Sequence, residues 1–375
     1  MKLDTLQVSN FRNFETLQIS PSPTVNLVYG ENGSGKSSIL EAIHLLGYGR
    51  SFRTVHPKNI IRHGASSFTV FTKCSEGKNT DSVTRVGVER SIADTFECSI
   101  NGERSKRISN VVSLFPVQIF TPQSVDLLLS GPSNRRKFLD WGLFHVEQSF
   151  FNLSSQYKKS VSHRNSLLKK MKQSSAHSGE KDSSNIVTQE LYWLENIVKG
   201  ASRINGLRTE YLERLEPIFN GFITQFLPEF SIEISYYGGW DLSKDLSLVL
   251  AEKRENDIRF GYTSVGAHKA DFKIKANGKL ATEILSRGQL RMLVAALQLA
   301  QSKLLFETTQ SGGIFLLDDI GAELDETKRA VFVGELLKSD AQIFITAIEK
   351  SQFSLSADAH NKKMFHVEHN RVTEE

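Results

Sequence analysis

Cysteine is scarce in this 375-residue sequence: only Cys74 and Cys98 are present, far apart in the chain. That spacing excludes a CxxC redox pair and a cysteine-rich metal site, and it is typical of a reducing compartment. Long hydrophobic runs are absent too, since no stretch approaches the roughly 20 apolar residues of a membrane helix. Residues 1–17 lack the apolar core of a signal peptide. We therefore expect a cytoplasmic protein with no membrane partner.

A strong charge of one sign is also missing. The 46 lysines and arginines nearly balance the 42 aspartates and glutamates, which leaves a formal net charge of +4. Such a balance permits an anionic partner without identifying one. Charged residues (23%) and hydrophobic residues (39%) are at ordinary globular levels. Because the chain is longer than a single core usually supports, we expect a main domain with a sub-domain.

The pattern of apolar residues divides the chain into three regions. Up to Pro116, short alternating and apolar runs predict strands and turns. Residues 146–215 follow a helical pattern that a polar stretch interrupts at 172–185, which indicates the tip of a helix hairpin. From residue 261 onward strand and helix signals return, and residues 313–317 form an apolar run typical of a buried parallel strand. The predicted divisions are 1–120, 121–305 and 306–375.

The second helix of the predicted hairpin carries a narrow apolar seam. Its residues alternate at spacings that suit packing against one antiparallel helix. The same stripe also fits one face of an ordinary core helix, and the spacing does not separate the two. The seam consists of Val187, Leu191, Leu194, Val198 and Ala201.

A phosphate-binding loop is the most specific local motif. Residues 30–37 read Gly-Glu-Asn-Gly-Ser-Gly-Lys-Ser and fit GxxxxGK[ST], between the apolar strand 25–29 and the helical run 38–46. The glycines let backbone N–H groups turn toward phosphate oxygens, and the following helix presents its positive end to the same anion. Lys36 would reach the β and γ phosphates of ATP, and Ser37 would bind Mg²⁺. The predicted nucleotide-binding residues here are Gly30, Glu31, Asn32, Gly33, Ser34, Gly35, Lys36, Ser37 and Ser38.

Two carboxylates support this interpretation. Residues 314–317 form an apolar strand that ends in Asp318 and Asp319, where a P-loop ATPase places its Mg²⁺ aspartate and a residue that orients the attacking water. We assign the metal role to Asp318 and the water role to Asp319, which together with Lys36 form the predicted catalytic set. Two aspartates at a strand end also fit a helix cap or a turn, but the loop at residues 30–37 favours the catalytic role.

A second phosphate-binding element precedes the apolar helix 290–305. Residues 285–289 read Leu-Ser-Arg-Gly-Gln. Ser286 and Gly288 would lie at a helix N-terminus, where backbone N–H groups can face a phosphate. The segment resembles the LSGGQ signature of ABC-type ATPases, with an arginine in place of one glycine. In that superfamily the signature of one subunit closes over the γ-phosphate held by another, so the resemblance implies an ATP-dependent homodimer. The predicted residues of this half-site are Ser286, Arg287, Gly288 and Gln289.

Other positions follow from the same resemblance. Asp325 comes after Asp319 as the D-loop aspartate does, and Thr346 follows an apolar strand at the switch position often held by histidine. Gln118 and Gln123 both lie near the Q-loop position, where a side-chain amide would sense Mg²⁺ or the γ-phosphate. The sequence does not choose between these two glutamines.

Over nearly its whole length the sequence resembles the RecF family, bacterial recombination and gap-repair ATPases related to the heads of SMC proteins. The implied fold is an α/β ABC-type P-loop ATPase head, with an SMC-like lobe I and an α-helical arm that forms an antiparallel hairpin. Two departures are Ala267, where family members usually have proline, and Ala322, where the D-loop usually has serine. The segments that carry the resemblance are 11–14 (Phe-Arg-Asn-Phe), 49–53 (Gly-Arg-Ser-Phe-Arg), 131–141 (Gly-Pro-Ser-Asn-Arg-Arg-Lys-Phe-Leu-Asp-Trp), 266–271 (Gly-Ala-His-Lys-Ala-Asp) and 286–291 (Ser-Arg-Gly-Gln-Leu-Arg).

The resemblance implies an ATP-dependent dimer that binds double-stranded DNA, favours junctions with single-stranded gaps and, with RecR and RecO, helps to load RecA. It implies ATP and Mg²⁺ as cofactors, slow hydrolysis as the release step, and association with the nucleoid when DNA is bound. It also places Arg12 and Asn13 beside the nucleotide, although a surface arginine at a strand end is the plain alternative for Arg12. The rival classes are a transporter ATPase subunit, whose second carboxylate is normally glutamate, and an SMC tether, whose coiled coil is far longer.

Lysines and arginines would supply most of the DNA affinity by neutralising phosphates. Such contacts need no base-reading geometry, so no sequence preference is expected. Each lysine taken alone also fits a solvated helix face. The candidates are Arg50, Arg53, Lys58 and Arg62 in the first region, Arg135, Arg136 and Lys137 before the arm, and Lys158, Lys159, Arg164, Lys169 and Lys170 along it.

Overall fold

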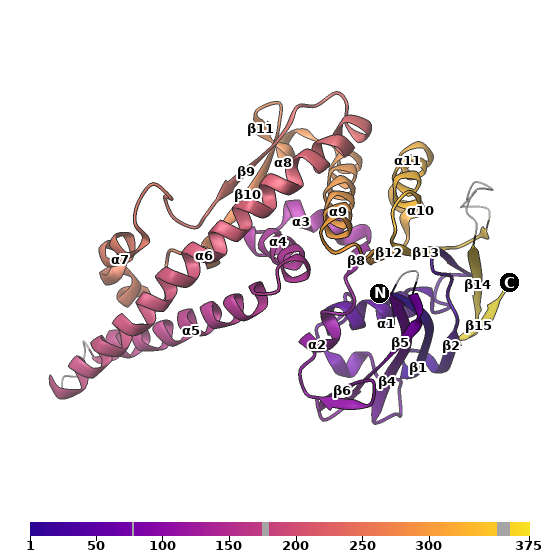
Figure 1. Ribbon diagram of the computed structural model, residues 1–375, viewed down its shortest axis with the longest axis horizontal. Helices are drawn as coiled ribbons and strands as arrows, with labels where there is room; N and C mark the ends of the chain where they lie inside the picture. The colour runs from indigo at the N-terminus through magenta and orange to yellow at the C-terminus, as the bar shows by residue number, and fades with distance from the viewer. Residues whose placement is uncertain (77–78, 175–179, 351–360) are drawn as a thin grey trace. The chain divides into compact units, whose positions relative to one another are not determined.

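The computed structural model describes residues 1–76, 79–174, 180–350 and 361–375, which form two compact units (Figure 1). Unit 1 contains Met1–Val125, Gly221–Leu227 and Ser286–Glu375, and unit 2 contains Asp126–Asn220 and Pro228–Leu285. This division groups residues 286–305 with unit 1, whereas the predicted divisions group them with the arm. None of the described helices is long and apolar enough to span a bilayer.

The first sheet of unit 1 is mostly parallel and buried. Its strands follow the order β15-β14-β3-β13-β12-β8, and all neighbours pair in parallel except β14 with β15. Every residue of the three central strands is buried, which explains why these strands appear in the sequence as continuous apolar runs. The strands are β15 (Arg371–Glu374), β14 (Lys362–Glu368), β3 (Val25–Tyr29), β13 (Gln342–Ala347), β12 (Ile314–Leu317) and β8 (Val117–Phe120).

The second sheet of unit 1 is antiparallel, in the order β2-β1-β4-β5-β6-β7. Buried and more exposed residues alternate along β1, as expected for a sheet with one face on the core. The strands are β1 (Lys2–Phe11), β2 (Phe14–Ile19), β4 (Ser67–Glu76), β5 (Asn79–Ser91), β6 (Phe96–Ile100) and β7 (Glu103–Ser105).

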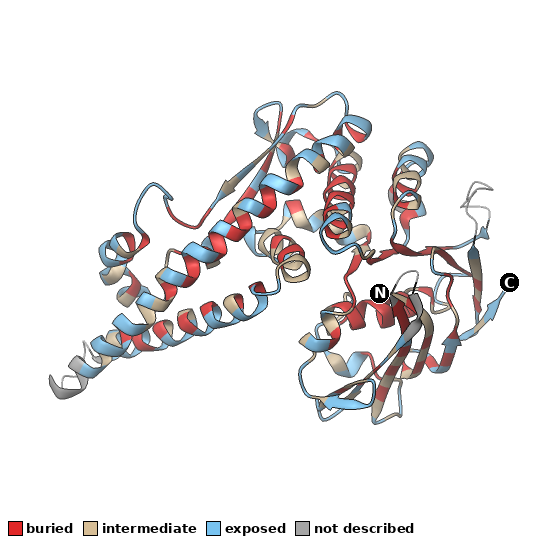
Figure 2. Cartoon of the chain, in the orientation of Figure 1, coloured by how far each residue is buried: buried red, intermediate tan, exposed pale blue. Residues whose placement is uncertain are grey.

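Helix α1 (Lys36–Tyr48) joins the two sheets of unit 1 through a single apolar core. Its Ile39, Leu40, Ile43 and Leu46 are fully buried and belong to the same cluster as residues of both sheets. Helix α9 (Arg287–Thr309) is buried on most of its faces, as the red colouring in Figure 2 shows. The other helices of unit 1 are η1 (Pro57–Asn59), α2 (Ser109–Val112), η2 (Pro122–Val125), α10 (Ile320–Glu323) and α11 (Glu326–Leu337).

Unit 2 combines a small antiparallel sheet, in the order β11-β10-β9, with helices. Ala267, one of the two departures from the family pattern, is buried in a short 3-10 turn. The side chain of Ala322, the other departure, lies outside what the structure describes. The elements of unit 2 are α3 (Asp126–Leu129), α4 (Pro132–Val146), α5 (Phe150–Ser174), most of α6 (Glu180–Phe226), β9 (Ile232–Tyr237), α7 (Leu246–Phe260), η3 (Ala267–Lys269), β10 (Asp271–Ala276), β11 (Lys279–Leu280) and α8 (Ala281–Ile284).

Helices α5 and α6 form the predicted antiparallel hairpin (Figure 1). A Cβ added at Gly200 would lie 3.0 Å from the Tyr157 ring, and farther along the hairpin the His163 ring stacks on Trp193 at 4.4 Å. The two helices therefore run in opposite directions and pack directly on each other. Part of the predicted tip, residues 175–179, lies outside the described residues.

The predicted seam on the second helix is wrong in its first part. Val187 is 39% and Leu191 is 54% exposed, whereas Ile197 and Ala201 are buried. The packing face includes Glu190, whose carboxylate is drawn into the interface by an arginine of α5 at 2.9 Å. A pattern built from apolar residues alone could not include a buried glutamate, and for that reason it followed the wrong stripe of the helix.

Candidate functional site

The loop after β3 has the backbone that a phosphate-binding loop requires. Gly30 has φ +148°, and a Cβ there would lie 2.2 Å from the backbone oxygen of Val367. Gly35 has φ +117°, and a Cβ there would lie 2.7 Å from the Phe14 ring. Only glycine fits these two positions without strain, because both the positive φ and the close neighbours exclude a side chain. The loop then leads directly into α1 at Lys36.

Lys36 is buried at the base of this loop. Its Nζ donates to the backbone oxygens of Gly30 at 2.7 Å and Glu31 at 2.8 Å. Burial lowers the pKa of Lys36, while the nearby Asp319 and Asp318 carboxylates act in the opposite direction. The ammonium group is thus held inside the loop by neutral oxygens, in reach of an anion that enters the loop.

Asp318 follows β12 and joins three elements. Its Oδ1 accepts hydrogen bonds from Ser37 Oγ of α1 at 3.0 Å and from Thr346 Oγ1 of β13 at 2.9 Å. Burial raises the pKa of Asp318, and the two hydroxyl hydrogen bonds lower it. Thr346 Oγ1 also accepts from the backbone N–H of Asp319 at 3.0 Å, so one threonine orients both carboxylate residues.

A polar cavity of about 430 Å³ lies beside these residues. It brings together much of the predicted nucleotide site, including Asp319, whose backbone adopts a left-handed conformation at φ 54°. A second cavity, of about 380 Å³, borders Glu31 and Ser34 and the β14–β15 hairpin. The first cavity is lined by Arg12, Asn13, Asn32, Gly33, Gly35, Lys36, Ser37, Ser38, Arg53 and Asp319.

A buried glutamate beside this cavity was missed from the sequence. Glu41 of α1 has no exposed surface, and its carboxylate accepts from Arg12 Nε at 2.8 Å and Nη2 at 2.6 Å. Arg53 Nη1 lies 3.8 Å from the same carboxylate. Glu41 therefore holds Arg12 and Arg53 at the cavity wall, so Arg53, which keeps 47% of its side chain exposed, adjoins the predicted nucleotide site and also stays a predicted DNA contact. The signal was available: Glu41 is the lone acidic residue of the mostly apolar helix α1.

These residues fit a nucleotide with Mg²⁺. Lys36, Arg12 and Arg53 supply positive charge to the cavity wall, and the loop supplies backbone N–H groups. Within the described residues, no cluster of three or more histidine, cysteine or acidic side chains is arranged to hold a metal by itself. In P-loop ATPases Mg²⁺ rests on one hydroxyl, one aspartate, phosphate oxygens and water, and Ser37 and Asp318 are the hydroxyl and the aspartate available for it here.

Of the two Q-loop candidates, only Gln123 stays in the prediction. Gln118 is buried in the middle of β8, and its Nε2 donates to Gln301 Oε1 of α9 at 3.1 Å. Gln123 is exposed in η2, directly after the carboxyl end of β8. Because β8 pairs in parallel with β12, that end lies beside Asp318.

The signature segment caps α9 with a capping box. Ser286 Oγ accepts from the Gln289 N–H at 3.3 Å, and Gln289 Oε1 accepts from the Ser286 N–H at 2.9 Å. Asp325 caps α11 in a similar way, by accepting from the Lys328 N–H at 2.9 Å. The Lys328 ammonium pairs with Asp325 at 2.8 Å and lies 3.7 Å from the Cβ position of Gly288. The predicted signature and the predicted D-loop aspartate thus lie side by side, and neither is among the residues that line the cavity of about 430 Å³.

The predicted DNA contacts divide into exposed and enclosed side chains. Arg135 is 12% exposed and binds Asp271 through two hydrogen bonds of 2.7 and 3.0 Å. Arg136 donates to the Ala270 oxygen at 2.7 Å, and burial lowers its pKa. Arg164 has no exposed surface, so its prediction as a DNA contact is wrong. The remaining candidates, Arg50, Arg53, Lys58, Arg62, Lys137, Lys158, Lys159, Lys169 and Lys170, keep at least part of their surface open.

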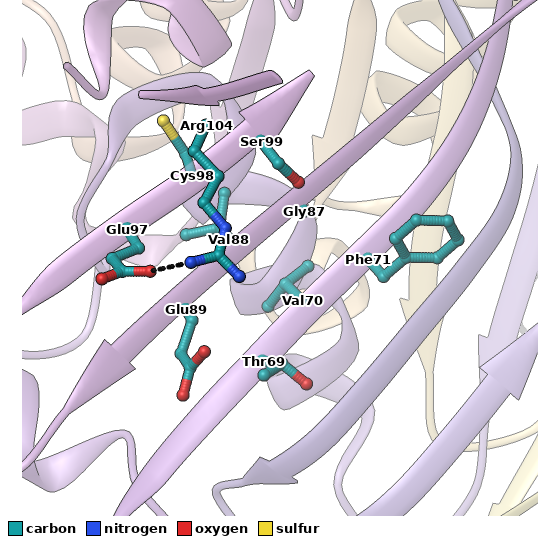
Figure 3. Close-up of a pocket in the computed structure, with 10 residues that line it drawn as sticks. All are labelled: Thr69, Val70, Phe71, Gly87, Val88, Glu89, Glu97, Cys98, Ser99 and Arg104. Carbon is teal, nitrogen blue, oxygen red and sulfur yellow. Dashed lines mark ion pairs between the residues drawn. The ribbon is translucent and has the colours of Figure 1, made fainter. Parts of the chain in front are cut away.

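A third cavity, of about 270 Å³, lies on the outer face of the antiparallel sheet over Gly87 (Figure 3). Glu89 and Glu97 line it, and Arg104 pairs with Glu97 at 4.0 Å. Two carboxylates and one already paired arginine do not suit a phosphate chain. The nucleotide site is therefore better placed at the loop of residues 30–37.

Comparison with known proteins identifies the family. A family model for the RecF/RecN/SMC N terminal domain matches residues 2–373. The chain is 50% identical over 375 residues to the DNA replication and repair protein RecF of Pseudoalteromonas atlantica, and the match covers 100% of both chains.

A solved structure of the recombination mediator protein RecF with ATP in the RecFOR pathway superposes with a TM-score of 0.86 at 28% identity, over 100% of this chain and 97% of that one. An SMC head bound to the C-winged helix domain of ScpA shares the fold alone, with a TM-score of 0.61, 13% identity, and coverage of 100% of this chain and 98% of that one. The α/β ATPase-head fold is thus confirmed, and the chain belongs to the RecF family of DNA replication and repair proteins.

Proposed function

We propose that this chain is an ATP-dependent DNA-binding ATPase of DNA repair that binds ATP with Mg²⁺ at the loop of residues 30–37. The observation that carries the proposal is the meeting of Ser37, Asp318 and Thr346 beside a cavity lined by cations. Mg²⁺, when bound, would neutralise charge on the phosphates. Lys36 would bind phosphate oxygens, and Asp319 would orient the attacking water. Arg12 and Asn13 would border the nucleotide.

The site is proposed to be completed by a second copy of the chain. Residues 286–289 and Asp325 lie together at one surface, apart from the residues that line the nucleotide cavity. A signature from a partner copy would close over the γ-phosphate, and ATP would thereby stabilise the dimer by mass action. Hydrolysis would remove that contact and release the dimer.

DNA is the proposed polyanion held by the ATP-bound dimer. Support comes from the relatives, which are described as DNA replication and repair proteins and as a recombination mediator of the RecFOR pathway. We propose that this chain binds duplex DNA near single-stranded gaps and acts with RecR and RecO in loading RecA. Lysines and arginines with open surface, such as Arg50, Lys58 and Lys137, would contact the phosphates.

The decisive experiment measures binding to gapped and blunt duplex DNA, with and without ATP, over a series of salt concentrations. Phosphate contacts predict a logarithm of affinity that falls linearly with the logarithm of salt concentration. Sedimentation in the same mixtures should show dimer only when ATP is present. Equal, salt-insensitive binding in both nucleotide states, or an unchanged monomer fraction, would contradict the proposal.

Two variants separate nucleotide binding from hydrolysis. Lys36→Ala should weaken ATP binding at least about 30-fold, because losing one partner of a buried charge contact costs about 2–5 kcal/mol. Asp319→Asn should keep an ATP-bound dimer and slow turnover about 100-fold, a usual size for the loss of a residue that assists proton transfer or water orientation. Wild-type turnover in Asp319→Asn would assign the water role elsewhere.

A further inference from the structure

Two aromatic rings at the end of α7 are exposed on unit 2. Phe260 is 54% and Tyr262 is 44% exposed, and their rings stack at 5.8 Å with an interplanar angle of 27°. Arg259 Cζ lies 5.9 Å from the centroid of the Phe260 ring, and Lys269 Nζ lies 5.0 Å from the centroid of Tyr262. We call Phe260 and Tyr262 the aromatic pair. Each of its rings is accompanied by a cation.

The turn between the two rings is fixed by Gly261. Its φ is +78°, and its N–H donates to the Asp257 backbone oxygen at 2.7 Å, which ends α7 with a left-handed glycine. A Cβ at this position would lie 3.1 Å from Lys169 Cγ of α5. The stem of Lys169 therefore packs against the turn, and its exposed ammonium group adds positive charge beside the aromatic pair.

A buried polar network fixes the backbone on both sides of the aromatic pair, at Asp257 and at residues 263–264. The Asp257 carboxylate, which has no exposed surface, accepts from Arg164 Nη1 at 2.7 Å and from the Ser264 N–H at 3.0 Å. The Thr263 N–H donates to Asn165 Oδ1 at 2.7 Å. Because this network already fixes the backbone that carries the two rings, ligand binding would cost little conformational entropy there. Most of the interaction energy of a ligand with the rings would therefore appear as affinity.

The segment that carries the aromatic pair is basic from Ile258 onward, although α7 has the exposed Glu252 and Glu255 before it. Residues 258–269 include Arg259 and Lys269 but no aspartate or glutamate. Helix α5 adds the exposed Lys169 and Lys170. Large rings are normally buried, and exposed rings interleaved with cations are how proteins hold single-stranded nucleic acid: bases stack on the rings, and the cations face the phosphates.

We propose that the aromatic pair is a stacking platform for unpaired bases of single-stranded DNA. The inference rests on the proposed function for the identity of the ligand, and it extends that function to a second, single-strand contact on unit 2. Bases of a duplex are already stacked on one another, so the platform distinguishes single strands from duplex. A preference for gapped over blunt DNA would follow from it.

The test uses the full-length double variant Phe260→Ala with Tyr262→Ala. Binding of fluorescently labelled oligo(dT) and of a blunt duplex is measured by anisotropy, each with and without ATP. Loss of the platform should weaken oligo(dT) binding about 10-fold, within the range for removal of base stacking, and leave duplex binding unchanged. The conservative double variant Phe260→Tyr with Tyr262→Phe should bind like the wild type. Leu248→Ala, which removes a 64% exposed residue from the first turn of the same helix, is the matched control and should change nothing.

Each other outcome overturns the platform. Unchanged oligo(dT) binding in the alanine variant would do so. Equal weakening for oligo(dT) and duplex, with an unchanged thermal unfolding curve, would show a general contact rather than a base platform. Failure of the proposed function is a separate result: the wild type would then show no ATP-dependent duplex binding, while oligo(dT) binding and its loss in the alanine variant would still be measurable.

Discussion

Both units bury charged side chains, but Lys36 and Asp318 of unit 1 and the Arg164 cluster of unit 2 have their charges satisfied in opposite ways. In unit 1, the partners of Lys36 are backbone oxygens, and the partners of Asp318 are two hydroxyl groups. In unit 2, Arg164 has two ionic partners, Glu190 at 2.9 Å and Asp257 at 2.7 Å, and none of the three side chains has exposed surface.

The kind of partner decides whether a buried charge can still bind a ligand. The hydrogen-bond partners of Lys36 and Asp318 are neutral, and neither side chain forms an ion pair among the described residues, so a phosphate and a divalent cation can still gain from their charges. In the cluster of unit 2, Arg164, Glu190 and Asp257 are already paired and fully enclosed, so these three side chains hold α5, α6 and α7 together. Buried charges with neutral partners, as in Lys36 and Asp318, can thus still bind a ligand, whereas the charges of buried ion pairs, such as Glu41 with Arg12 in unit 1 and Arg164 with Glu190 in unit 2, are already satisfied.

The largest predicted effect is on unit 2, from Arg164→Met. The change leaves Glu190 and Asp257 buried without their shared cation, so the free energy of unfolding of unit 2 should fall by about 3–5 kcal/mol. Tryptophan fluorescence during urea unfolding measures this unit selectively, because all three tryptophans, Trp141, Trp193 and Trp240, lie in it.

The matched control is Arg254→Met. Arg254 also pairs with Glu190, at 3.1 Å, but is 33% exposed, and such a pair contributes at most about 1 kcal/mol. Equal losses in the two variants would mean that enclosure does not distinguish the cluster. ATP binding by unit 1 should be unchanged in both variants.

The same substitution should have opposite signs in the two units. Asp257→Asn removes a charge that Arg164 needs, and it should cost unit 2 about 1.5–3 kcal/mol. Asp318→Asn removes a charge that burial disfavours while keeping an oxygen for Ser37 and Thr346, so it should stabilise nucleotide-free unit 1 at neutral pH. Calorimetry of the nucleotide-free variants measures both signs.

The gain from Asp318→Asn should depend on pH. The pKa of Asp318 is raised in the folded state, so the folded protein holds the proton more tightly than the unfolded chain does. Wild-type stability from this group is present at low pH and is lost as pH rises from the unfolded pKa through the folded one. The advantage of the asparagine variant should therefore be full at neutral pH and vanish below about pH 3.8. A gain independent of pH would point to packing instead of charge.

A smaller effect is expected from Thr346→Val. The valine lacks the hydroxyl that donates to Asp318 and accepts from the Asp319 N–H, and one such hydrogen bond contributes about 1 kcal/mol. Mg²⁺-dependent binding of a fluorescent ATP analogue should weaken about 5-fold. Thr346→Ser keeps the hydroxyl and should bind like the wild type. Equal binding by the valine variant would remove Thr346 from the site.

The nucleotide loop could be predicted from sequence because its determinants are local. The glycines, Lys36 and the flanking strand and helix are consecutive, and the Asp318 strand is a continuous apolar run. The side chains that surround and support the loop pair with residues distant in the chain. Glu41 with Arg53 and Gln118 with Gln301 are such pairs, and no local pattern specifies them.

The arm shows the same limit. The helix hairpin could be predicted because helical periodicity depends only on residues a few positions apart. It did not show that Arg164 is enclosed, since a lysine- and arginine-rich helix is ordinarily a solvated one. Once Arg164 draws Glu190 inward, the face of α6 that packs is fixed, and the apolar stripe through Val187 and Leu191 is left outside.

The smallest effect is therefore expected from Leu191→Ala, although the residue is a large apolar one on a long helix. Because Leu191 is 54% exposed, its truncation should change the stability of unit 2 by no more than about 0.5 kcal/mol. The matched change is Ile197→Ala, six residues on and fully buried, which should cost about 2–5 kcal/mol. Tryptophan fluorescence during urea unfolding compares the two directly. A loss in Leu191→Ala as large as that in Ile197→Ala would restore the apolar seam as the packing face, and Glu190 would then no longer explain which side of α6 is buried.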